Sequence, residues 1–121
     1  MLSIQGSPLE VPVLGGMLAR QSRGYGFMVC GGLVVLFWGG YRTVHGFLAE
    51  EYTDPAAADV VVLEKVEQKM REGYRLAVAP RSGTVDLLAC PGLAPAGPGV
   101  ERDLRTADVA LLATLLGLFL Y

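Results

Sequence analysis

The longest apolar segment of the chain is the uncharged stretch Gly24–Tyr41, with Arg23 before it and Arg42 after it. As a helix, these eighteen residues would be about 27 Å long, close to the thickness of the hydrocarbon core of a bilayer. Tyr25 and Trp38 lie near its two ends, where aromatic residues meet the membrane interface. The pattern predicts a transmembrane helix. The alternative is a buried helix of a globular core, but a short chain has little else with which to surround one.

The predicted transmembrane helix continues to residue 46 and carries a stripe of small side chains. Gly32, Gly39, Thr43 and Gly46 fall within about 60° of one another on a helical wheel. Such a stripe lets another helix, a lipid or a flat pigment approach the backbone closely. We therefore predict a helix-packing face at these four residues and a partner that occupies it. The alternative is that membrane helices simply tolerate glycine.

Helical periodicity returns over residues 54–73. Asp54 stands where an N-cap is expected, with a proline at the first helical position. The apolar positions of this segment share one stripe: Val62, Leu63, Val66 and Met70. We predict an amphipathic helix outside the membrane.

The remaining segments are shorter or irregular. Residues 1–23 contain two prolines and a Gly-Gly pair, which predict an irregular N-terminal segment. Residues 74–90 resemble two short strands of a β-hairpin, and residues 91–105 a linker rich in proline and glycine. Residues 106–121 are apolar and would form a helix of about 24 Å. We favour a second transmembrane helix there; a helix docked on a neighbour and a helix lying in the interface are the alternatives.

Composition agrees with a membrane protein. Hydrophobic residues make up 52% of the chain before its 16 glycines are counted, and the mean hydropathy is +0.43. The fold class expected is therefore a mainly α membrane protein with a small α+β extramembrane segment. Basic residues before the first apolar segment place the N-terminus on the matrix, stroma or cytoplasm side. We expect an integral protein of an organellar inner or thylakoid membrane.

Candidate chemistry is sparse. The chain has one histidine and two distant cysteines, too few for a closed zinc site or a nucleophile–base–acid set. His45 could ligate haem or chlorophyll, although a lone histidine at a helix end is usually just a polar interfacial residue. Ten basic residues are interleaved with twelve acidic ones, and this pattern lacks the basic patch expected of a nucleic-acid-binding protein.

These observations predict a protein that is not an enzyme. We expect a structural accessory subunit of a large respiratory or photosynthetic complex, in a mitochondrion or plastid, whose partners are other membrane subunits and lipid. No cofactor is certain; lipid or chlorophyll bound within the complex is the expected kind. The alternative is a bacterial envelope protein in which one membrane helix anchors a small folded module for assembly or signalling.

Overall fold

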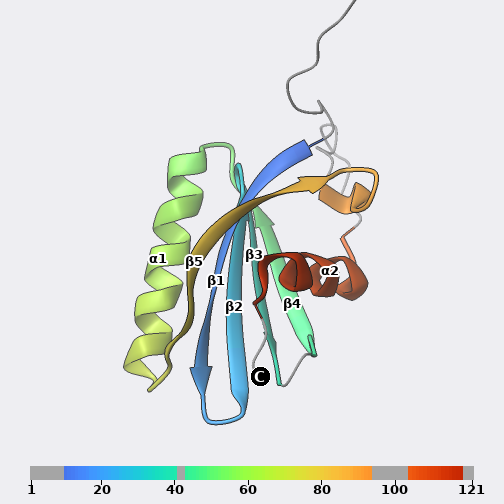
Figure 1. Cartoon of the computed structure of the whole chain (residues 1–121). Coiled ribbons are helices and arrows are strands. Elements are labelled where there is room, and N and C mark those ends of the chain that lie inside the picture. The colour runs from blue at the N-terminus through green and yellow to red at the C-terminus, as the bar shows by residue number, and fades with distance from the viewer. Residues whose placement is uncertain (1–9, 41–42, 94–103, 119–121) are drawn as a thin grey trace, which may run out of the picture.

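The computed structural model describes residues 10–40, 43–93 and 104–118. It shows one antiparallel sheet with a helix on each face (Figure 1). The strands are β1 (Glu10–Arg20), β2 (Arg23–Cys30), β3 (Leu33–Gly39), β4 (Gly46–Glu51) and β5 (Arg75–Asp86), in the spatial order β4-β3-β2-β1-β5. The helices are α1 (Pro55–Arg71), α2 (Thr106–Leu116) and the short 3₁₀ helix η1 (Pro91–Leu93).

The prediction of a transmembrane helix over residues 24–46 is wrong. Its uncharged stretch forms β2 and β3, which pair in register from Gly24 opposite Gly39 to Cys30 opposite Leu33. Both strands are interior to the sheet, and both of its faces are covered, so apolar residues occupy both sides of each strand. Two such strands joined by a tight turn give a continuous apolar run instead of an alternating one.

The predicted fold class and location are corrected with it. The protein is a small α+β protein built on a five-stranded sheet. Within residues 10–40, 43–93 and 104–118, no helix is both long enough and apolar enough to cross a membrane. The prediction of a mainly α integral protein of an organellar inner or thylakoid membrane is therefore not supported.

Helix α1 occupies the segment predicted as an amphipathic helix. The Asp54 side chain accepts a hydrogen bond from the amide of Ala56 at 3.0 Å, and Pro55 follows at the first helical position. Ala58 and Val62 are buried against one face of the sheet. Their core cluster consists of Tyr25, Phe27, Val29, Val34, Leu36, Ala58 and Val62.

Helix α2 covers the opposite face. Its eleven residues fall in the segment 106–121, and four of them (Val109, Leu112, Ala113 and Leu116) are buried. They pack in the larger core cluster with side chains of β1, β2, β3 and β5, including Val13, Met28, Phe37 and Val85. The apolar character of this segment thus reflects packing on the chain's own sheet. Residues 119–121 lie outside the described part.

The segment predicted as a hairpin forms one long strand. Arg81, Ser82 and Gly83, in the middle of that segment, form no turn; they continue β5 and pair with β1, so that Gly83 stands opposite Val13. Pro80 is tolerated because β5 lies at the edge of the sheet, where one side of the strand has no partner strand. Of the two segments predicted to be irregular, the first contains β1 and the second begins with η1; residues 1–9 and 94–103 lie outside the described part.

Candidate ligand-binding site

A cavity of about 830 Å³ lies at the end of the sheet where three connections meet: β1–β2, β3–β4 and α1–β5. It is formed by the β1–β2 turn, the end of β3, the start of β4 and the C-terminal turn of α1 with the residues that follow it. Its charged and aromatic lining residues are Arg23, Tyr25, Trp38, His45, Lys69 and Tyr74. The volume lies within the range of about 300–1,000 Å³ that is common for small-ligand sites.

The ammonium group of Lys69 lies over the rings of two tyrosines. Its Nζ atom lies 4.6 Å from the ring centroid of Tyr25 and 5.4 Å from that of Tyr74. The two rings meet edge to face, with centroids 6.3 Å apart. Nζ is also 3.6 Å from the carboxylate of Glu72. Cation–π contacts and this ion pair fix the ammonium group against the cavity wall while 23% of the side chain stays exposed.

Trp38, on β3, pairs with Tyr25 of the neighbouring strand β2 and also lines the cavity. Its indole lies over Gly46, where an added Cβ would come within 2.9 Å of the ring nitrogen. The amide of His45 donates a hydrogen bond to the Trp38 carbonyl at 2.8 Å. The Thr43 hydroxyl lies 3.3 Å from Nε2 of His45. Although its backbone is fixed in this way, Trp38 remains 44% exposed, so part of the indole is open to a ligand.

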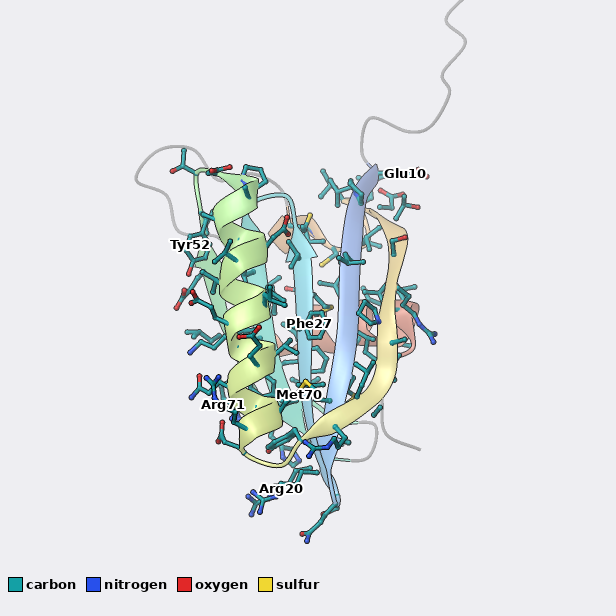
Figure 2. The ribbon with its side chains drawn as sticks, turned by 90° about the vertical axis from the view of Figure 1, so that its left-hand side faces the viewer. Glu10, Arg20, Phe27, Tyr52, Met70 and Arg71 are labelled. Atoms are coloured by element: carbon teal, nitrogen blue, oxygen red, sulfur yellow. The ribbon has the colours of Figure 1, made fainter. Side chains whose placement is uncertain are left out.

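The fold sorts charge along the long axis of the molecule (Figure 2). Strand register and the direction of α1 place five cationic side chains at the cavity end, near the carboxylate of Glu72: Arg20, Arg23, Lys69, Arg71 and Arg75. Figure 2 shows Arg20 and Arg71 at this end and Glu10 at the other. The other end carries Glu10, Glu50, Glu51, Asp54, Asp59 and Asp86. We call these the basic end and the acidic end.

Burial raises the pKa of the Tyr25 hydroxyl above its ordinary value of 10.0, and the nearby Glu72 carboxylate and Tyr74 raise it further. Tyr25 is therefore a neutral hydrogen-bond donor in the cavity at physiological pH.

The native state keeps the proton of the Tyr25 hydroxyl at a pH where the unfolded chain has lost it, so the free energy of unfolding should fall as pH rises above about 10. Between about pH 9 and about pH 11, the urea midpoint should therefore fall less for Tyr25→Phe than for the wild type. Parallel pH curves for the two proteins would contradict this.

The structure separates the residues predicted as a helix-packing face. Gly32 lies in the β2–β3 turn, where an added Cβ would collide with the backbone of Tyr52. Gly39 and Gly46 lie at the opposite end of β3 and β4, and Thr43 lies between these strands. They share no helix, so the close approach that their small size allows is to the chain's own backbone and to Trp38. His45 lines the cavity with Gly39 and Thr43; its role as a haem or chlorophyll ligand stays a prediction.

Sequence reasoning missed the residues that give the cavity its chemistry. Arg23, Lys69 and Tyr74 come from three separate elements, and no spacing in the sequence connects them. The available signal was Trp38, the single tryptophan of the chain, followed by small and polar residues at a strand end.

The arrangement is suited to binding. Cations, hydroxyl groups and an accessible indole converge in it, whereas no cluster of three or more metal-binding side chains occurs among the residues that the structure describes. Comparison of the chain with family models, curated proteins and solved structures gave no match.

Proposed function

We propose that this protein is a non-catalytic module that binds nucleic acid at its basic end. In this proposal, the guanidinium of Arg23 and the ammonium of Lys69 contact phosphate, and the indole of Trp38 stacks on a base. The observation that carries the proposal is the exposed tryptophan in the same cavity as two cations. Cationic grooves with aromatic platforms are the usual means of binding single strands.

The surrounding charge supports the choice of an anionic ligand. Arg20, Arg71 and Arg75 flank the cavity at the basic end, so the local potential is positive although the whole chain carries a net charge of −2. The expectation that nucleic acid is not a partner rested on the interleaving of acids and bases along the sequence. Because the fold moves many of the acids to the opposite end, interleaving in sequence does not describe the surface that a ligand meets.

One part of the sequence-based functional prediction is retained in this proposal. The protein acts by binding and not by catalysis. The cavity has a histidine, but its Nε2 lies beside the Thr43 hydroxyl on an exposed loop, and neither group is oriented by a third residue among the described contacts. A nucleophile–base pair needs such an orienting group. An accessory role inside a membrane is not part of the proposal.

Trp38 gives a direct test, because it is the only tryptophan of the chain. The full chain would be titrated with a short single-stranded oligonucleotide while its intrinsic fluorescence is recorded. We expect quenching as a base stacks on the indole, and an affinity that falls with salt by about 0.7 log units per log unit of salt for each phosphate contacted. ATP and inorganic phosphate, titrated separately, show whether a single nucleotide or the phosphate alone suffices.

Two results would overturn the proposal. One is unchanged fluorescence, with no binding by a second method, at oligonucleotide concentrations up to about 1 mM in low salt, the weak limit of useful affinity. The other is binding that does not respond to salt, because contacts to phosphate release counterions and must be salt-dependent.

A further inference from the structure

The outer face of α1 carries apolar residues at positions that the chain's own core does not use. Ala58 and Val62 point into the core, whereas Val60 and Leu63 are 54% and 60% exposed. Met70, the last residue but one of the helix, is 42% exposed. Figure 2 looks directly onto this helix, and no other element lies in front of it.

These exposed residues follow the spacing of a coiled-coil seam. Ala56, Val60, Leu63, Glu67 and Met70 are separated by four, three, four and three residues, and four of these five positions are apolar. A helix of a single globular domain ordinarily keeps its apolar stripe for its own core and presents polar residues outward. A second stripe with alternating spacings of four and three is the pattern by which one helix packs against another.

We propose that α1 binds α1 of a second copy of this chain, with the two helices antiparallel. Charge selects this partner and direction. Asp54 and Asp59 lie at the N-terminal end of α1. Around its C-terminal end, the cations Lys69, Arg71 and Arg75 (the first residue of β5) outnumber the acids Glu67 and Glu72, so this end carries a net positive charge. An antiparallel pair places the acidic end of one copy against the basic end of the other, whereas a parallel pair places like charges together. Antiparallel helix dipoles add to the preference.

This surface is distinct from the proposed ligand cavity. Lys69, which lines the cavity, faces the two tyrosines at the sheet, while Val60 and Leu63 point away from the core. Oligonucleotide binding and self-association can therefore be measured separately, and either can fail without the other.

The test is the molar mass of the full chain by sedimentation equilibrium over about 10 µM to 1 mM, the range suited to a weak dimer. We expect a monomer–dimer equilibrium, and we expect Leu63→Glu to raise the dimer dissociation constant at least tenfold. Leu88→Glu is the matched control: Leu88 is 74% exposed and lies after β5, away from α1, so this variant should associate like the wild type. Circular dichroism confirms that both variants are folded.

A charge exchange tests the direction of the helices. Asp59→Lys and Arg71→Glu should each weaken the dimer, and the double variant should recover most of the lost affinity, because the exchanged charges again meet as opposites. A wild type that stays monomeric throughout, or that binds only a different protein on this face, would overturn the proposal. A Leu63→Glu variant that dimerises like the wild type would overturn the use of α1. Failure of the double variant to recover would overturn the antiparallel arrangement.

Discussion

Replacing Arg23 and Lys69 together by glutamine is expected to weaken oligonucleotide binding about 100-fold in low salt. Each side chain would lose a charge-assisted hydrogen bond to phosphate. At the low end of the usual range, about 1.5 kcal/mol for each bond, the two losses total about 3 kcal/mol, which corresponds to a factor of roughly 100 to 200. The salt dependence should also become shallower, since fewer counterions are released. The measurement is the Trp38 fluorescence titration, repeated at several salt concentrations.

The chain offers a matched control on the same helix. Lys65 lies one turn before Lys69, and it is not among the lining residues of the cavity. Lys65→Gln removes the same charge as Lys69→Gln, so it should change affinity by no more than about twofold, as expected of a screened charge. If Lys65→Gln and Lys69→Gln lowered the affinity equally, the binding would depend on net charge alone and the cavity would not be the binding site.

Local signals in the sequence located α1 but not the sheet. The Asp54-Pro55 start and the stripe through Val62 are contained within one segment, and the structure has a helix over Pro55–Arg71. Nothing outside the segment is needed to recognise a cap followed by a helical period. The same periodicity did not reveal that Leu63 and Met70, which share the apolar stripe, stay exposed.

The prediction of a helix over the apolar run that forms β2 and β3 was wrong for a physical reason. A strand covered on both faces has no polar side, so its sequence loses the alternation that identifies strands and resembles an apolar helix. Gly31 and Gly32 were the residues that indicated a turn within this run. Gly31 adopts a φ of +59°, which a tight turn requires, and Gly32 lies against the backbone of Tyr52. On a helical wheel Gly32 belongs to a face of small side chains, whereas in the structure Gly31 and Gly32 form the turn between β2 and β3.

The candidate site could not be predicted from the sequence, because its residues are distant along the chain and are brought together only by the fold. Its two cations come from the start of β2 and from the end of α1, since Arg23 and Lys69 are 46 positions apart in the sequence. Their proximity depends on the pairing of β1, β2 and β3 and on α1 running parallel to the same face. Charge sorting between the two ends arises in the same way, since antiparallel strands bring distant termini of elements together.

Gly26→Ala is expected to destabilise the fold by about 3 kcal/mol or more, a large part of the roughly 5–15 kcal/mol of a small domain. Gly26 stands opposite Phe37 in the β2–β3 ladder, and the Phe37 ring lies across it. An added Cβ would collide with this ring, coming within 2.6 Å of even Cε2. Phe37 is 2% exposed and packs in the α2-side core, so the ring cannot move aside without disturbing that core. Urea unfolding followed by circular dichroism measures the loss.

If the cost of Gly26→Ala comes from the collision with the Phe37 ring, two further results are expected. Gly40→Ala should cost less than about 1 kcal/mol, because the nearest atoms to its Cβ lie at 3.8 Å, an ordinary contact distance. Phe37→Leu should be destabilising alone, yet less so in the Gly26→Ala background, because the smaller side chain leaves room for the new methyl group. A double-mutant cycle should therefore show a favourable coupling of about 1 kcal/mol or more. Additive losses would mean that Gly26 is needed for its backbone freedom and not for the space above it, and β2 and β3 would then owe their close pairing to something other than the Phe37 ring.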